Sequence, residues 1–146
     1  MSSPPATTFE GVLDGVSDVE GWMTEDQARK LWNGARSVRP GGRIVEIGSF
    51  RGRSMIVLAS AAPTDVELVA IDPHAGNDRG PQEIEGFADE AAEDNVVFNA
   101  NLAAAGVADR VTHLRMFSDD ALAEVPGDID LLYIDGAHRF LSLIHI

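Results

Sequence analysis

The sequence of 146 residues has no cysteine and no long apolar run. Without cysteine, neither disulfides nor thiolate metal sites can form, which suits a reducing compartment. No apolar run reaches the roughly 18 residues that a membrane span needs, and the N-terminus lacks the apolar core of a secretory signal. We therefore expect a protein of the cytoplasm that does not cross a membrane.

Basic residues are scarce. The sequence has 11 Lys and Arg residues against 24 Asp and Glu residues, which gives a net charge of −13. This balance disfavours nucleic acids and anionic membrane surfaces as partners, because both attract clustered basic residues. It leaves the oligomeric state open.

Strand-like and helix-like segments alternate along the chain. The predicted strands are 43–47, 66–71, 111–116 and 129–134, and the predicted helices are one that follows Thr24 and three at 54–61, 88–105 and 121–124. Thr24 and Gln27 have the spacing of a capping box, and Gly106 is placed to end the long helix. Alternation of this kind is typical of an α/β fold with a parallel sheet and right-handed crossovers.

The length is sufficient for one domain. Residues 1–16 are small, polar and proline-bearing, and we expect them to form a flexible tail. Residues 17–140 hold the predicted strands and helices. The last six residues, LSLIHI at 141–146, are apolar where a surface segment should alternate. They resemble translated sequencing-adapter read-through, and the alternative is a natural terminal strand or turn.

Residues 45–54, VEIGSFRGRS, join a β-branched strand to a helix start through two glycines. Gly48 allows the chain to turn without a Cβ clash, and Gly52 allows a ligand to approach the backbone. A strand, a glycine loop and a helix N-terminus together bind nucleotide-like ligands. The alternative is a loop that serves only the packing of strand and helix.

Polar groups follow the other predicted strands, at the sheet edge where α/β folds bind ligands. Asp72 lies 24 residues beyond Gly48, and an acid near that distance accepts hydrogen bonds from ribose hydroxyls. Ser118 and Asp119 follow the third strand, where they would reach a purine, although Asp119 also suits the start of a short helix.

The fourth predicted strand ends at Asp135, and His138 stands three residues later. This pair is well placed for chemistry at the same edge, but the spacing also occurs by chance. Three other histidines, His74, His113 and His145, are better explained as surface or packing residues.

Five segments resemble class I S-adenosylmethionine (SAM)-dependent methyltransferases, and more narrowly a small-molecule O-methyltransferase-like family whose fourth strand ends in D-G-x-H. They are GWMTEDQARKLW, RIVEIGSFRGRSMIVLA, VAIDPHAG, FNANLAAAGVADRVTHLRMFSDDA and LLYIDGAHRF. They occur in the family's order over about residues 20–140. The resemblance implies a Rossmann-like, doubly wound parallel sheet, here an incomplete class I fold of about four strands, with 17–140 as the N-terminal part of the SAM-binding domain.

The resemblance also implies roles for individual residues. Residues lining the methionine portion of SAM would be Glu46, Gly48, Ser49 and Gly52. Asp72 would hold the ribose, and Ser118 with Asp119 would lie near the adenine. In metal-dependent relatives the acid at the position of Asp135 binds a divalent cation, typically Mg²⁺, and the histidine at the position of His138 acts as general base.

The implied function is methyl transfer to an oxygen of a small-molecule acceptor. The family usually continues beyond the fourth strand into segments that supply further metal ligands, so we expect this chain alone to be an inactive fragment. Two alternatives stay open: a nicotinamide-dependent oxidoreductase with the same loop and Asp72, and a non-catalytic nucleotide-binding module. The pattern E-x-G-x-x-x-G from Glu46 to Gly52 favours SAM over the dinucleotide pattern G-x-G-x-x-G.

Overall fold

The computed structural model describes residues 8–19, 23–49, 51–72, 88–116, 118–125 and 127–134. The α-helices are α1 (Phe9–Gly15), α2 (Glu25–Arg36), α3 (Arg53–Ala61), α4 (Ala88–Ala104) and α5 (Ser118–Ala121). The strands are β1 (Arg43–Ile47), β2 (Glu67–Ile71), β3 (Val111–Leu114) and β4 (Leu131–Ile134). Two 3₁₀ helices, η2 (Ala108–Arg110) and η3 (Leu122–Glu124), complete the described elements.

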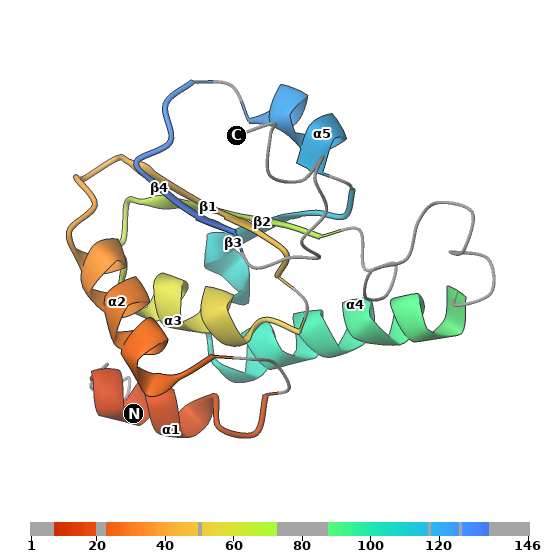
Figure 1. Ribbon diagram of the computed structural model, residues 1–146, viewed down its shortest axis with the longest axis horizontal. Helices are drawn as coiled ribbons and strands as arrows, with labels where there is room; N and C mark the ends of the chain where they lie inside the picture. The colour runs from red at the N-terminus through yellow and green to blue at the C-terminus, as the bar shows by residue number, and fades with distance from the viewer. Residues whose placement is uncertain are drawn as a thin grey trace.

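The four strands form one parallel sheet in the order β3-β2-β1-β4 (Figure 1). Strands β2 and β3 are added on one side of β1, and the chain then crosses back to add β4 on the other side of β1. A doubly wound sheet of this order binds ligands at the carboxyl ends of its strands. The predicted α/β class and the four parallel strands are confirmed.

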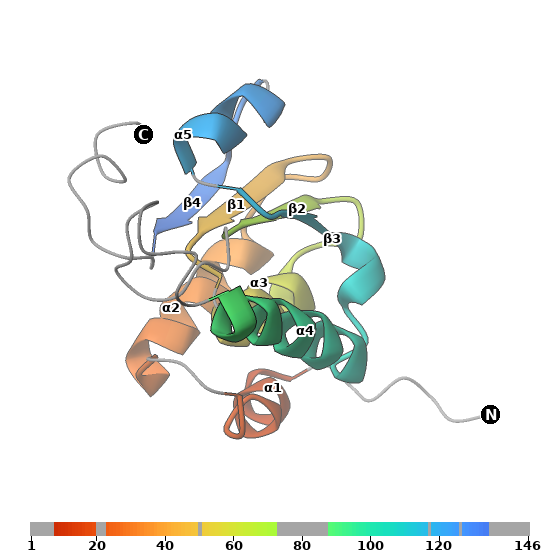
Figure 2. The same cartoon turned by 90° about the vertical axis from the view of Figure 1, so that its right-hand side faces the viewer.

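Alternation along each strand divides the core into two parts. In β1, Ile44 packs with α1–α4, whereas Val45 and Ile47 pack on the opposite face with Ala121 and Val125 of the α5 region. Figure 2 shows α3 and α4 on one side of the sheet and α5 on the other. Both faces of β1 are therefore covered, as expected of a central parallel strand.

The predicted helix boundaries follow from the capping residues. Thr24 Oγ1 accepts from the Gln27 amide at 3.1 Å, and the Gln27 side chain accepts from the Thr24 amide at 2.9 Å, which completes the capping box. Gly106 has a φ of +75°, and the Val107 amide reaches back to the Leu102 carbonyl at 3.0 Å. This is the Schellman arrangement that ends α4.

The prediction of a flexible tail over residues 1–16 is wrong for its second half. Thr8 caps α1 by accepting from the Gly11 amide at 3.1 Å, and Phe9 and Val16 are buried. The Phe9 ring meets Trp32 of α2 edge-on, with 5.8 Å between centroids. The burial of these apolar side chains outweighs the low helix propensity of two glycines in the segment. Residues 1–7 lie outside the described residues.

Arg110 joins the end of α3 to the start of β3. Its guanidinium donates to the backbone carbonyls of Ala59, Ala62 and Pro63, the last at 2.7 Å. These include carbonyls that a helix end leaves without partners inside the helix. Burial of the guanidinium lowers the pKa of Arg110 from its ordinary value.

None of the helices formed by the described residues is long and apolar enough to cross a membrane.

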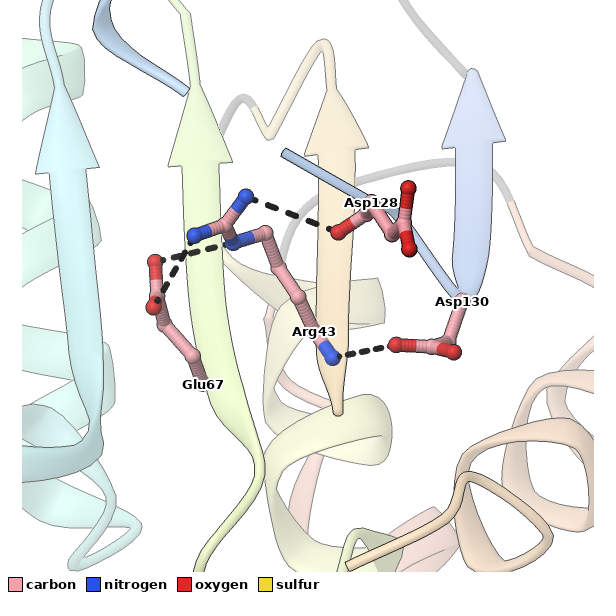
Figure 3. A network of polar contacts seen from close by, with 4 residues as sticks. All are labelled: Arg43, Glu67, Asp128 and Asp130. Carbon is pink, nitrogen blue, oxygen red and sulfur yellow. Dashed lines mark hydrogen bonds and ion pairs between the residues drawn. The ribbon is translucent and has the colours of Figure 1, made fainter. Parts of the chain in front are cut away.

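Arg43, the first residue of β1, ties together the amino ends of three strands (Figure 3). Its guanidinium pairs with Glu67 at the start of β2, with 3.2 Å between Nε and Oε1, and donates to the Asp128 carbonyl. Its backbone amide donates to Asp130 Oδ2 at 2.9 Å, just before β4. Asp130 also accepts from Arg39 Nε at 2.9 Å. The network holds β2, β1 and β4 side by side at the edge opposite the glycine loop.

The Asp130 carboxylate gives the fold a pH dependence. The Arg43 amide, followed by the Arg39 side chain, lowers the pKa of Asp130 below its ordinary value. Its stabilising contribution is therefore full above the unfolded pKa of about 3.9 and is lost as the pH falls through the lower folded-state value. Between about pH 5 and pH 2 the free energy of unfolding should fall less steeply in Asp130→Asn than in the unmodified chain.

Urea unfolding at a series of pH values measures this slope. Asp128→Asn is the matched control, since it removes the same charge two residues away, where the carboxylate makes no hydrogen bond to any described residue. Equal slopes for the two variants would contradict the role of Asp130.

Candidate functional site

The glycine loop lies at the carboxyl end of β1. Gly48 has a φ of +91°, and its amide donates to the Ile71 carbonyl of β2 at 2.8 Å. Four residues later Gly52 has a φ of +97°, and its amide donates back to the Ser49 carbonyl at 2.9 Å. Side chains with a Cβ rarely adopt these φ values. The two glycines therefore allow the chain to leave the strand, turn, and enter α3 within a few residues.

Gly52 is also closely packed. A Cβ at this position would lie 3.3 Å from Phe98 and 3.5 Å from Leu102, both on α4. Phe98 is fully buried, and its ring also packs on His113 of β3, with 4.6 Å between centroids. Helix α4 therefore lies directly against the loop, which agrees with the packing role that the sequence left open for this glycine.

Glu46 is fully buried in β1, between Ala70 of β2 and Tyr133 of β4 in the strand register. Ser54, the second residue of α3, donates its hydroxyl to Glu46 Oε2. The amino end of α3 carries the positive end of the helix dipole, which favours a nearby carboxylate. Serine at position 54 was not predicted as a site residue. The signal for it was a hydroxyl residue at the start of the helix that follows the glycine loop.

Two further polar groups lie at the same edge of the sheet. The Ser49 hydroxyl is buried, with 2% of the residue exposed, and has no hydrogen-bond partner among the described residues. Asp72 directly follows β2, is half-buried, and its amide donates to the Leu114 carbonyl of β3 at 3.2 Å. The register Ile47–Ile71 puts Gly48 and Asp72 beside each other. A buried hydroxyl and carboxyl groups around a glycine turn suit a ligand with both donors and acceptors.

Asn101 of α4 contacts the loop backbone, which sequence analysis did not predict. Its amide nitrogen, Nδ2, donates to the Arg51 carbonyl at 2.9 Å, across 50 residues of sequence. Asparagine near the end of a helix gives no local signal of such a bond.

Ser118 and Asp119 follow the third strand but do not lie directly at its end, because β3 stops at Leu114 and Ser118 is the first residue of α5. The alternative reading of Asp119, as part of a helix start, agrees with this position. Their proposed adenine contacts stay predictions. The described residues contain no cluster of His, Asp and Glu that could hold a metal ion. Asp135 and His138 lie outside the described residues, as does the segment 141–146.

A parallel sheet with a glycine loop and acids at its carboxyl edge defines a Rossmann-like ligand-binding fold. Residues 45–145 match the family model described as a methyltransferase domain. The match covers more than half of the chain and includes the glycine loop, Asp72, Asp135 and His138. The chain belongs to this methyltransferase family, and its fold is part of the class I SAM-dependent methyltransferase fold. No curated protein matches the sequence.

Solved structures agree with this assignment. Cofactor-bound Rv0187 from MTB is 27% identical, with a TM-score of 0.59, and the match covers 88% of this chain and 51% of that one. The O-methyltransferase TomG from Streptomyces achromogenes, solved in complex with SAM, is 27% identical, with a TM-score of 0.54 and coverages of 93% and 56%.

An O-methyltransferase from Bacillus cereus, solved with S-adenosylhomocysteine (SAH), shares the fold at 20% identity, with a TM-score of 0.58 and coverages of 91% and 56%. The chain therefore spans about half the length of these solved chains.

The two demands on Gly52 can be separated by substitution. Gly52→Ala meets both the strained φ and the Phe98 contact, whereas Gly41→Ala meets a φ of +76° with open space around the new Cβ. We expect Gly41→Ala to lower the free energy of unfolding by about 1 to 2 kcal/mol. Gly52→Ala should cost roughly 1 kcal/mol more, because Phe98 must move. Urea unfolding measures both, and equal losses would show that α4 does not press on the loop.

Proposed function

We propose that this chain forms the cofactor-binding part of a SAM-dependent methyltransferase that methylates an oxygen of a small metabolite. The observation that carries the proposal is the pair of buried polar side chains, Glu46 and Ser49, on either side of Gly48. Membership of a methyltransferase family and the SAM and SAH complexes of similar structures support it.

The residues of the loop fit the methionine portion of SAM. That portion carries an ammonium group and a carboxylate, which need acceptors and donors respectively. Glu46 would attract the cation, and the Ser49 hydroxyl, which has no partner among the described residues, would complete the hydrogen bonds. Gly48 and Gly52 would let the ligand approach the backbone, and Asp72 would accept from the ribose hydroxyls. When bound, SAM would supply the methyl group as a sulfonium substituent.

The same carboxyl group argues against a nicotinamide dinucleotide. In dinucleotide-binding folds the anionic pyrophosphate lies at the helix N-terminus that follows the glycine loop. Here Glu46 lies at that terminus, hydrogen-bonded to Ser54 of α3. A carboxylate in that place would repel a pyrophosphate and attract the cationic groups of SAM.

An oxygen acceptor is proposed from the O-methyltransferases among the similar structures. Transfer of a methyl group requires an aligned oxygen nucleophile, deprotonated or hydrogen-bonded to a base. His138 is the proposed general base, and Asp135 the proposed ligand of a divalent cation such as Mg²⁺, which would lower the pKa of the acceptor hydroxyl. Ser118 and Asp119 remain the proposed residues near the adenine.

Calorimetric titration with SAH tests the cofactor. We expect the chain to bind SAH and not NAD. Asp72→Ala should weaken SAH binding at least tenfold, because hydrogen bonds to a charged group contribute roughly 1.5–3 kcal/mol each. Asp65→Ala, at an exposed position in the turn before β2, serves as control and should leave the affinity unchanged. Preference for NAD, or equal effects of the two substitutions, would contradict the proposal.

We further predict that the chain by itself binds the cofactor without turnover, because it spans only about half the length of the similar solved chains. Incubation with methyl-labelled SAM, Mg²⁺ and a panel of small phenols and hydroxy acids should give no labelled product. Labelled product above the level of a heat-denatured sample would contradict this prediction while supporting the methyltransferase function.

A further inference from the structure

Helix α4 contacts the glycine loop through one face. Phe98, Asn101 and Leu102 have the i, i+3, i+4 spacing that places side chains together on a helix. Phe98 and Leu102 lie against the Cα of Gly52, and the Asn101 amide donates to the Arg51 carbonyl at 2.9 Å. The apolar contacts set the distance between helix and loop. The asparagine bond fixes an orientation.

The carbonyl of Arg51 and the amide of Gly52 belong to one peptide group. The carbonyl accepts from Asn101, and the amide donates to the Ser49 carbonyl at 2.9 Å. This peptide plane is therefore held at both ends, once by the loop itself and once by α4. Because glycine adopts positive and negative φ about equally readily, the peptide plane before Gly52 can turn about the ψ of Arg51 and the φ of Gly52 at little steric cost.

We propose that Asn101 is a positioning residue for the cofactor: it prevents rotation of the Arg51–Gly52 peptide and so keeps the loop in the conformation that receives the methionine portion of SAM. The inference rests on the proposed function. Asn101 acts through the backbone and does not touch the ligand. The amide is half-buried, and a hydrogen bond away from water is costly to leave unmade.

This role makes a prediction that general destabilisation does not. The loop would contact the amino-acid portion of the ligand, whereas Asp72 would hold the ribose. Loss of the Asn101 hydrogen bond should therefore weaken the binding of ligands that carry the amino-acid portion and leave the binding of ligands that lack it unchanged. SAH carries it, and 5′-methylthioadenosine has the same adenosine and thioether without it.

The matched pair of variants is Asn101→Asp and Asn99→Asp. Each adds one negative charge to the same helix at nearly constant size. Only Asn101→Asp removes a hydrogen bond to the loop. The Asn99 side chain is exposed and donates to the Asn95 carbonyl of its own helix at 3.0 Å. By titration calorimetry we expect Asn101→Asp to weaken SAH at least tenfold and 5′-methylthioadenosine less than twofold. Asn99→Asp should change neither affinity by more than twofold.

Unchanged SAH affinity in Asn101→Asp would overturn the inference. An equal loss of affinity for SAH and for 5′-methylthioadenosine would also overturn it, because it indicates general destabilisation. Hydrogen exchange of the ligand-free chain gives a second readout that does not depend on binding. The Gly52 amide should exchange at least tenfold faster in Asn101→Asp than in Asn99→Asp.

If the unmodified chain fails to bind SAH, the proposed function is wrong, and the exchange comparison still decides whether Asn101 holds the loop. Equal exchange rates in the two variants would overturn that as well.

Discussion

Glu46 puts a carboxyl group inside the sheet, on a strand that is paired on both sides and covered on both faces. A buried carboxyl group is costly unless it is hydrogen-bonded, so the chain must bring a donor to it. Ser54 provides this donor, eight residues later. To deliver Ser54 there, the chain must turn sharply after Ile47 and start a helix almost at once. The two positive φ values, at Gly48 and Gly52, make that turn possible. The turn at the two glycines therefore serves Glu46 as well as the proposed ligand.

The two edges of the sheet have different tasks. At the amino edge, Arg43 pairs with Glu67 and its amide donates to Asp130, so these groups stabilise the strand order. At the carboxyl edge, the Ser49 hydroxyl is buried without a partner among the described residues. Register is transmitted from one edge to the other, because β2 pairs along the whole of β1 and β4 pairs with β1 from Ile44 to Ile47. The ion-pair network thus positions Gly48 beside Asp72 from the far end of the strands.

Where apolar patterning is dense, sequence predicted structure well. The first strand was predicted at its observed bounds, and the other three to within a few residues, because β-branched runs bounded by glycine or proline leave little choice. The helix α1 was missed although Phe9, Val12, Leu13 and Val16 have helical spacing. Gly11 and Gly15 and the polar start of the chain obscured that pattern, whereas in the structure the helix is supported by the contact of Phe9 with Trp32. Local sequence does not report such a tertiary contact.

Site residues divide in the same way. Sequence could propose Glu46, Gly48, Ser49, Gly52 and Asp72, because a strand end and a glycine loop define their neighbours along the chain. Ser118 was placed at the end of a strand, whereas it starts α5, since two polar residues before a helix fit either position. Asn101 could not be found, because its partner is a backbone carbonyl 50 residues away and a carbonyl has no sequence signature. Side chains that act on the backbone of a distant loop require a structure to be recognised.

The same reasoning bears on which properties of the cofactor site belong to this chain. The groups proposed for the methionine portion and the ribose all lie on β1, β2 and the loop, and they are held by α3 and α4. These elements share one core with the strands, so the site is stabilised by the packing of the described residues themselves. The acceptor is different. Its proposed contacts, Asp135 and His138, lie outside the described residues, and an O-methyltransferase needs an acceptor oxygen aligned with the sulfonium methyl group. We therefore expect substitutions in the Glu46–Gly52 loop to alter cofactor affinity through groups that this packing holds in place.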